Sequence, residues 1–474
     1  MSNLFSSLRA SATALDALQQ SAASAQNNVS NAGTAGYARQ RAQVSALPFD
    51  PEQSALGGVE VRGLVSSRDQ FAEQAVREQA SGLKSSQEKS TQLAFFEANF
   101  DLNDTIGIAS RMNKLFTAFS SWTVAPLSES EKTNVISSAQ NLAESFRGAA
   151  ASLQASAQNA EKRITTTLSR IDDLAERVRQ FNVGVRTSMT GDSGASSSVH
   201  SDLEELASFA DFQAIWQKDG TVTVLLGRQV ALVNGDAKFG FTTVPDSTVP
   251  LAGLEGATPK LQLRDHTGAD VTRIVTGGQL GALLQFRNET VPRFAGSVTD
   301  AGDLNRLAKQ MADRVNQILT DGDPNPPASI KLFQYSNLGS AALSLTVPAA
   351  MTTAVLSASD PTTAPANVNG RAVKLAALAQ PGSSADKLDG LSYMSFFGNI
   401  TSKVGRLAAE ANAAVESRKQ MHAQALGIRD DISGVSLDQE ALTLMEVQRS
   451  YEATSRIIAA IDEMTRLAVN IGRN

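Results

Sequence analysis

The sequence contains no cysteine and is poor in aromatic and charged residues. Without cysteine, disulfides, thiolate metal sites and cysteine nucleophiles are all excluded. Aromatic residues make up 5% and charged residues 19% of the 474 positions, whereas 42% are hydrophobic. This balance favours slender helical packing over one bulky globule, and the length favours two to four domains. The net charge of -6 gives no reason to expect a broad basic face for nucleic acid.

The motifs of the common enzyme classes are also missing. The three histidines, His200, His266 and His422, are far apart and lack metal-ligand spacing, and neither H-E-x-x-H nor a phosphate-binding G-x-x-x-x-G-K-[ST] loop occurs. The adjacent acidic residues are Asp172-Asp173, Glu204-Glu205 and Asp430-Asp431, and they are typical of solvated faces. We therefore expect no enzyme, cofactor or metal site, although a glycosidase carboxylate pair in the β-rich part stays open as an alternative.

Long hydrophobic runs are absent as well. The first residues have no basic segment followed by a solid apolar one, so we expect no cleaved signal peptide. The longest uncharged run lies between Lys331 and Asp360, but Pro348 interrupts it and Ser and Thr are frequent in it. A membrane span is therefore not expected.

The N-terminal segment has a helical pattern with almost no charge. Between Met1 and Ala38 the only charged side chains are Arg9 and Asp16. Steps of four and three residues separate Leu4, Leu8, Ser11, Leu15, Leu18, Ala22, Ala25 and Val29. This heptad spacing predicts a helix with one apolar seam, ending between Asn31 and Gly36. Because so few charges solvate it, we expect something other than water to cover this helix.

The C-terminal segment has a matching pattern. Near-heptad spacing relates Leu444, Val447, Tyr451, Thr454, Ile458, Ile461, Met464, Ala468 and Ile471. Isolated helices of such length are marginal in water, so each terminal seam needs a partner. We therefore predict that the two termini pair as a coiled coil, and that both are mobile in the free subunit until assembly orders them.

Between the termini, a β-rich module interrupts a helical chain. Residues 57–65 predict a strand or hairpin, and residues 191–198 (GDSGASSS) predict a flexible boundary. Four strand-like runs separated by turn residues are Phe212–Trp216, Thr221–Leu226, Gln229–Val233 and Phe239–Val244. Helical patterns return over 279–320 and 393–431. Residues 321–327 end the first of these helical regions, and the pattern of 332–368 predicts strands and loops.

The predicted fold is mainly α with inserted β, in which paired terminal helices continue into a long helical-bundle stalk that carries a β-rich outer module. The expected terminal coiled-coil domain, or inner tube, comprises 1–45 with 432–474. The helical stalk comprises 46–195 with 279–325 and 376–431. The β-rich outer domain comprises 199–278 with 326–375.

Short motifs at both ends and in the middle resemble one family. Near the N-terminus a run of asparagines precedes T-x-G-Y-x-R: Asn27, Asn28, Asn31, Thr34, Gly36, Tyr37 and Arg39. Near the C-terminus, a second motif covers residues 433–464 and begins SGVSLDQE. Three further motifs lie in the interior of the chain: 218–235, 277–287 (GGQLGALLQFR) and 307–316. These motifs resemble the flagellar axial proteins, and within them the hook-associated protein 1 family of first hook-filament junction proteins.

The resemblance implies a structural subunit in a ring between hook and filament, with the terminal helices inside and the β module outside. It implies export through the flagellar type III channel to an extracellular position at this junction. The implied partners are further copies, hook protein, the next junction protein on the filament side, and an export chaperone at the C-terminal helix, with no nucleic acid or membrane insertion. Hook protein, the other junction protein, and a secreted coiled-coil adhesin or effector stay open as alternatives.

Residues in the terminal motifs and seams are the candidates for assembly. Gly36 and Tyr37 form a turn that either connects the inner helix to the stalk at a fixed angle or is an ordinary helix cap followed by an anchoring aromatic. The full set of candidate assembly residues is Leu4, Leu8, Leu15, Leu18, Asn28, Asn31, Thr34, Gly36, Tyr37, Arg39, Ser433, Gly434, Leu437, Leu444, Tyr451, Ile458 and Ile461.

Overall fold

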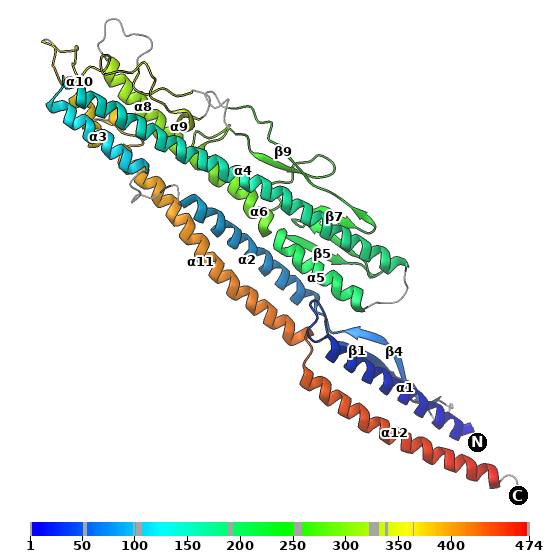
Figure 1. The fold of residues 1–474 in the computed structure, drawn as a ribbon. Helices are drawn as coiled ribbons and strands as arrows, with labels where there is room; N and C mark the ends of the chain where they lie inside the picture. Colours follow the sequence, from blue (N-terminus) through cyan, green and yellow to red (C-terminus); the bar gives the residue numbers. More distant parts are fainter. Residues whose placement is uncertain are drawn as a thin grey trace.

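The computed structural model describes residues 2–50, 55–97, 100, 107–187, 193–250, 258–321, 331–336, 340–363 and 365–471. The molecule is elongated, and its long helices run roughly along its length (Figure 1). Both termini lie at the same narrow end, and the strands of the outer unit cover one side of the stalk (Figure 1). The predicted fold, mainly α with inserted β and paired terminal helices, is confirmed.

The terminal unit consists of two long helices and small strands. Helix α1 (Ser2–Asn31) lies beside α12 (Leu437–Ile471). Helix α1 ends where the Asn-Gly-rich stretch begins, as predicted. Strands β1 (Gln40–Ala46) and β4 (Val59–Ser66) form an antiparallel pair against α1, with β2 (Phe49–Asp50) and β3 (Ala55–Leu56) at their turn. The strand expected in 57–65 is thus present, and its partner β1 was not predicted.

The stalk is built from antiparallel helices. Helix α2 (Gln70–Glu97) packs along α11 (Tyr393–Ser433), while α3 (Ile108–Val124) packs on the 59-residue α4 (Glu129–Thr187). The buried side chains of α4 recur every three or four residues because only one stripe faces the core. A single continuous hydrophobic cluster extends from the stalk helices into the outer strands, so the stalk and outer unit share a core.

Helix α5 (Ser193–Phe209) leads from the stalk into the outer unit. The flexible stretch predicted over 191–198 is therefore wrong from Ser193 onward. The small residues from Ser193 onward form the first turns of α5, whose Val199, Leu203 and Leu206 are buried. This burial stabilises a helix that begins with poor helix formers.

The outer unit contains two antiparallel sheets. Strands β5 (Phe212–Trp216), β6 (Val222–Leu226), β7 (Val230–Asn234) and β8 (Ala237–Lys238) form a meander. Strands β9 (Thr242–Pro245) and β10 (Leu261–Arg264) form a separate pair. The first three predicted strands are confirmed, but a single strand over 239–244 is wrong. The chain leaves the first sheet after Lys238 and joins the second at Thr242, so this apolar run bridges two sheets.

The helical region predicted over 279–320 is interrupted. It comprises α6 (Gly278–Gln285), the π-helical turn η2 (Phe286–Thr290), α7 (Val291–Ala295) and α8 (Asp303–Thr320). The chain reverses at Gly296 and Gly302, both with positive φ. A Cβ on Gly302 would lie 2.3 Å from the Gly296 nitrogen, so this close approach of backbones requires glycine.

The remaining described chain covers the far end of the stalk. It includes α9 (Ala341–Ser344), α10 (Gly370–Ala376) and the 3₁₀ turns η3 (Ala377–Ala379) and η4 (Ser384–Asp386). The part of 332–368 that the structure describes forms loops, α9 and two isolated bridges, Gln334 with Thr346 and Asp360 with Asn367, rather than regular strands. Most of the predicted breaker at 321–327 lies outside the described residues. Among the helices described, none combines the length and apolarity needed to span a bilayer.

Candidate assembly site at the terminal helices

Asn28 lies at the centre of a polar joint between the terminal helices and the stalk. Its Nδ2 donates to the Gln40 carbonyl at 2.8 Å and to Glu440 Oε2 at 3.2 Å. Its Oδ1 accepts from the Gln40 backbone nitrogen and from the Tyr37 hydroxyl, both at 2.9 Å. Asn28 is 1% exposed, and both ends of its amide are fully engaged. One side chain thereby ties α1 to β1 and to α12.

Glu440 is the matching residue on the C-terminal helix. Its side chain is buried, and Oε1 lies 2.6 Å from Arg39 Nε in an ion pair that spans nearly the whole sequence. The Arg39 backbone nitrogen also donates to the Ser433 carbonyl at 2.9 Å. Because a buried carboxylate is stable only when it is paired and hydrogen-bonded, Glu440 fixes where α12 begins relative to β1.

Ser433 and Gly434 form the break between α11 and α12. The Ser433 hydroxyl donates to the Ser67 carbonyl at 3.2 Å and accepts from the Asp69 nitrogen at 3.3 Å, which joins the end of α11 to the start of α2. A Cβ on Gly434 would lie 2.4 Å from the Asp430 carbonyl oxygen, so any larger residue would displace the break.

The turn after α1 packs against the stalk. Gly36 has a φ of 71°, and a Cβ there would lie 2.4 Å from the Ser197 carbonyl oxygen in α5. Tyr37 also accepts a hydrogen bond from Asn27, and its pKa is raised by burial and then by the nearby Glu440 charge. Thr34 donates its backbone nitrogen to the Asn31 carbonyl, so it closes the turn locally. The turn therefore acts both as a helix end and as a contact with the stalk.

A charge cluster extends the joint into the stalk. Arg68 pairs with Glu73 at 2.5 Å and donates to the Gly36 carbonyl, while Arg429 of α11 pairs with Glu204 of α5 at 2.9 Å. Burial lowers the pKa of Arg68 and of Arg77, whose guanidinium lies 3.8 Å from Glu73. The turn, α2, α5 and α11 are thus held by one network.

The sequence predicted only some of the residues of this joint. The structure places Asn28, Tyr37, Arg39, Ser433 and Gly434 together there, with Asn31, Thr34 and Gly36 in the adjoining turn. Glu440, Arg68 and Glu73 were missed. Glu440 stands inside the C-terminal motif, so its position there was the available signal, whereas Arg68 and Glu73 carry no local signal that separates them from surface charges.

The candidate apolar residues divide between two environments. Ile461 is buried, while Leu15, Leu18, Leu444 and Ile458 are half-buried. Leu8, Leu437 and Tyr451 are exposed, and the side chain of Leu4 lies outside the described residues. The predicted seam is therefore only partly closed within one chain.

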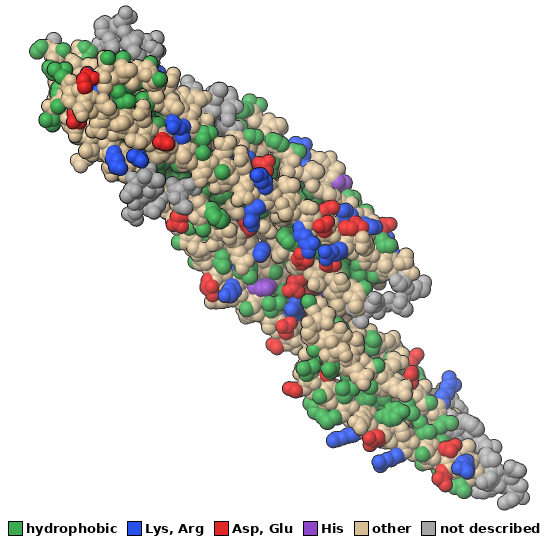
Figure 2. Space-filling model, viewed as in Figure 1, with side chains coloured by type: hydrophobic (Ala, Val, Ile, Leu, Met, Phe, Trp, Pro, Cys, Tyr) green, Lys and Arg blue, Asp and Glu red, His purple; other side chains and the backbone are tan. Residues whose placement is uncertain are grey.

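A further apolar row occupies the face of α12 turned away from α1. We call it the outer face of α12, and its members are Leu442, Met445, Ile457, Met464 and Leu467. Met464, which the heptad spacing predicted to lie in the seam with α1, is 50% exposed and is counted with this face. Each is 50–57% exposed. Figure 2 shows hydrophobic side chains gathered over the terminal unit, with charged side chains among and around them. Apolar area of this extent on a protein surface marks an interaction site.

No arrangement for metal chemistry occurs among the described residues, where no group of three or more His, Cys, Asp or Glu side chains is placed to hold an ion. His200 is buried and stacks on Trp216 with ring centroids 4.7 Å apart. Burial, followed by the charges of Arg68 and Arg77, lowers its pKa to about 2. This histidine is therefore a neutral core residue.

Comparisons with known proteins agree on one family. The sequence model described as "Flagellar hook-associated protein FlgK helical domain" matches residues 97–333, which is half of the chain. A second, "Flagellar basal body rod FlgEFG protein C-terminal", matches residues 431–471, the segment that contains α12.

Individual relatives extend the likeness beyond those segments. Flagellar hook-associated protein 1 of Bacillus subtilis is 22% identical over 99% of both chains. The Escherichia coli protein of the same name is 23% identical over 64% of this chain and 55% of its own length. The structure of the flagellar hook junction protein FlgK from Burkholderia pseudomallei has the same fold, with a TM-score of 0.63 and 14% identity over 77% of this chain and 100% of that one. The chain belongs to the flagellar hook-associated protein FlgK family, and its role is that of a structural protein of the bacterial flagellum.

Proposed function

We propose that this protein is a structural subunit of the junction between hook and filament, and that it assembles with further copies through its paired terminal helices. The observation that carries this proposal is the outer face of α12, which stays apolar and exposed after α12 has paired with α1. An apolar row on a second helix face has no role within the described part of the chain, but it suits lateral packing between subunits.

The expected gain from such packing is considerable. Fully burying a Leu, Ile or Met side chain stabilises by about 2 kcal/mol. Because each side chain of the outer face is about half exposed, covering it adds about 1 kcal/mol, or about 5 kcal/mol for the row. Repeated around a closed ring, this gain recurs at every interface and offsets the entropy of association.

The polar joint gives that packing a fixed direction. The bonds of Asn28, Arg39 and Glu440 hold α1, β1 and α12 together. The contacts of Ser433 with Ser67 and Asp69 then connect this terminal pair to the start of α2, which supports one fixed angle to the stalk. Subunits that share this angle would align their terminal helices side by side as an inner tube. In this arrangement residues 1–45 with 432–474 form the tube, 46–195 with 279–325 and 376–431 the stalk, and 199–278 with 326–375 the outer domain.

The remaining partners follow from this position. We propose that the subunit is secreted through the flagellar type III channel, contacts hook protein on one side and the next junction protein on the other, and is protected by a chaperone at α12 before assembly. The role proposed for it is structural and not enzymatic. The candidate assembly residues of the two terminal seams and the joint act in this role through packing and through orientation of the helices.

A pair of substitutions on the outer face tests the proposal. Leu442→Asp with Leu467→Asp introduces two charges where neighbouring copies would pack, and neither residue belongs to the predicted seam with α1. The matched control is Val124→Asp, because Val124 is 86% exposed at the opposite end of the molecule. Each variant replaces the native protein in the source bacterium, and secreted subunit and attached filaments are measured separately.

We expect the outer-face variant to fold and to be secreted, but to shed filament protein into the medium from intact hooks. The Val124→Asp strain should retain attached filaments. Normal filaments on the outer-face variant would contradict the proposal, and so would equal loss in the control. Circular dichroism of both purified proteins separates lost assembly from lost folding.

A further inference from the structure

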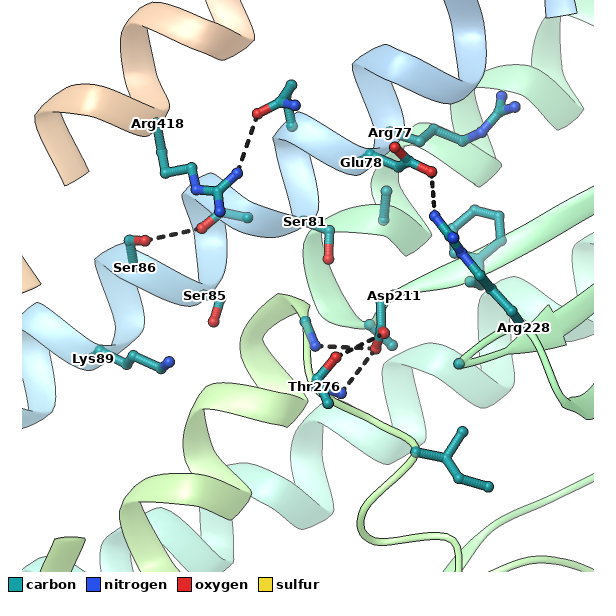
Figure 3. A pocket seen from close by; sticks show the side chains of 18 residues that line it. Arg77, Glu78, Ser81, Ser85, Ser86, Lys89, Asp211, Arg228, Thr276 and Arg418 are labelled. Carbon is teal, nitrogen blue, oxygen red and sulfur yellow. Dashed lines mark hydrogen bonds and ion pairs between the residues drawn. The ribbon is translucent and has the colours of Figure 1, made fainter. Parts of the chain in front are cut away.

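A cleft of about 630 Å³ lies where the stalk meets the outer unit, away from the terminal helices. One wall is α2, and Arg418 of α11 forms its rim. The opposite wall consists of the end of α5, the turn between β6 and β7, and the chain that enters α6 (Figure 3). None of the roles described above uses this cleft.

The cleft carries an excess of positive charge. Its lining includes the cations Arg77, Lys89, Arg228 and Arg418 and only two carboxylates, Glu78 and Asp211. The protein as a whole has a net charge of -6, so the sign of the charge in the cleft is opposite to that of the whole chain. Such a patch attracts an anion from solution.

Two of these cations already have partners. Arg228 pairs with Glu78 at 2.5 Å, and Arg77 lies 3.8 Å from Glu73, outside the cleft. Arg228 has a φ of 64°, an uncommon conformation for a residue other than glycine, which directs its side chain toward Glu78 across the cleft (Figure 3).

The other two cations, Lys89 and Arg418, have no carboxylate within ion-pair distance among the described residues. Among the described residues, Arg418 makes one long hydrogen bond, 3.4 Å from Nη1 to Gln79 Oε1. Lys89 is partly buried, and this burial lowers its pKa. The charge of Glu289 acts on the pKa of Lys89 in the opposite direction, but no carboxylate of the described residues forms an ion pair with its ammonium group. An added anion in direct contact with this partly buried group would therefore be stabilising here.

The wall between these cations offers hydroxyl groups. Ser81 is 5% exposed, and its Oγ has no hydrogen-bond partner among the described residues, while Ser85 is almost as buried. In Figure 3 both hydroxyls are directed toward the interior of the cleft. A buried hydroxyl without a partner loses free energy that a ligand oxygen would restore.

Glycines on both walls leave room in the cleft. A Cβ on Gly277 would lie 2.6 Å from Ser81 Oγ, so only glycine fits against that hydroxyl. A Cβ on Gly82 would lie 3.2 Å from Arg418 Nη1, so the absence of a side chain there lets the guanidinium lie against α2. Glycine at these two positions preserves the approach to both Ser81 and Arg418.

Asp211 does not cancel this preference for anions. Its Oδ1 accepts from the backbone nitrogens of Thr276 and Gly277 at 3.2 and 3.0 Å, and its Oδ2 accepts from the Thr276 hydroxyl at 3.2 Å. These donors satisfy the carboxylate and hold it against the chain that enters α6. The open part of the cleft is thus left to Lys89, Arg418 and the serines.

We propose that this cleft binds a phosphate or sulfate group through Lys89 and Arg418, with Ser81 and Ser85 as hydroxyl donors. A tetrahedral oxyanion presents several acceptor oxygens in different directions, which suits a point-charge ammonium, a forked guanidinium and two hydroxyls better than a flat carboxylate does. The volume accommodates more than a free ion, so the group is either inorganic or carried on a larger molecule.

The test measures binding of inorganic phosphate to the full chain by isothermal titration calorimetry, with total ionic strength held constant by sodium chloride. We expect saturable binding that weakens at least tenfold in Lys89→Ala and in Arg418→Ala, and further in the double variant. Lys419→Ala is the matched control, because Lys419 is exposed and adjacent to Arg418 but does not line the cleft. Circular dichroism and Lys89→Arg, which retains the charge, show that any loss is not one of folding.

Three further ligands identify the group. Sulfate should bind in the same way as phosphate. If glycerol 3-phosphate binds more tightly than phosphate, the site takes a carried phosphate, and if it binds more weakly, the site takes the free ion. Tighter binding of glutarate than of phosphate would overturn the assignment. The assignment would also be overturned if phosphate showed no saturable binding or if the double variant bound phosphate as the wild type does. An equal loss of binding in Lys419→Ala would overturn it as well.

Discussion

Asn28→Asp is the sharpest single test of the polar joint, because it changes one atom group without changing the shape of the side chain. The Asn28 amide donates from Nδ2 to the Gln40 carbonyl and to Glu440 Oε2. An aspartate has no donor at this position, so both bonds are lost. The new carboxylate also faces two acceptors, one of which is the buried charge of Glu440.

The size of the effect follows from these contacts. Losing two hydrogen bonds, one of them to a charged group, costs about 3 kcal/mol. Two carboxylates near 3.2 Å apart repel strongly in a buried site, and protonation of one of them limits that cost to a few kcal/mol more. The total is about 5 kcal/mol. It acts on the docking of α1 and β1 against α12, since the stalk core lies elsewhere.

Hydrogen exchange measured peptide by peptide is the appropriate assay, because a protein of several units does not unfold as one. We expect the amides of α1 and of β1 to exchange at least a hundredfold faster in Asn28→Asp, while those of α4 stay unchanged. Gln26→Glu is the control, since Gln26 is exposed on the same helix and the substitution adds the same charge. If Asn28→Asp exchanges no faster than this control, the joint does not hold the terminal unit.

Two further substitutions test contacts in the stalk and outer unit. Asn182→Ala removes three hydrogen bonds of 2.8 Å to Val222 and Gly235, so we expect the outer sheet to open more easily by about 3 kcal/mol, measured by proteolysis against the exposed control Asn134→Ala. Tyr393 is fully buried, and its hydroxyl has no partner in the described part of the chain, so Tyr393→Phe should leave stability unchanged or raise it by up to about 1 kcal/mol in urea titrations. Burial raises the pKa of Tyr393 to about 12, whereas an unfolded tyrosine ionises near 10; wild-type stability should therefore fall between about pH 10 and 12, and the phenylalanine variant should lack this component. An identical fall in both proteins would show that Tyr393 does not contribute to it.

Features with a local period were predictable from the sequence. The heptads of α1 and α12 indicate helices because an apolar stripe recurs with the helical turn, and two incomplete stripes indicate a pair. The pairs Asp219-Gly220 and Asn234-Gly235 indicate the turns around β6 and β7 in the same way. In each case the signal lies within one turn of helix or one hairpin.

Features that depend on distant partners were not predictable. Arg39 and Glu440 stand 401 positions apart, and neither residue type nor spacing marks them as a pair. The run 239–244 has strand propensity, but propensity does not say that only Thr242 onward forms a strand, in a different sheet from β8. Similarly, the heptads indicate one seam on α12, whereas its outer face becomes visible only once α1 is seen to cover the other side.

The buried asparagines explain how such distant parts are joined. Asn28 binds both the nitrogen and the carbonyl of Gln40, and Asn182 binds those of Val222. The same double contact links Asn288 to Leu261 and Asn316 to Phe333, with distances of 2.8 to 3.0 Å. A side-chain amide offers one donor and one acceptor side by side, as a neighbouring strand does.

Asn28, Asn182 and Asn288 therefore substitute for a strand partner beside β1, β6 and β10, and each selects one residue of its strand. Asn316 makes the same contact with Phe333, which lies next to an isolated bridge at Gln334. A shift in register would place a different residue opposite the amide and leave buried groups unpaired. In a sequence pattern such a polar residue looks like an interruption of the apolar stripe. In the structure, such an asparagine sets the position of a β segment on its helix. Asn28 does so for β1, and it also connects this strand to Glu440 of α12.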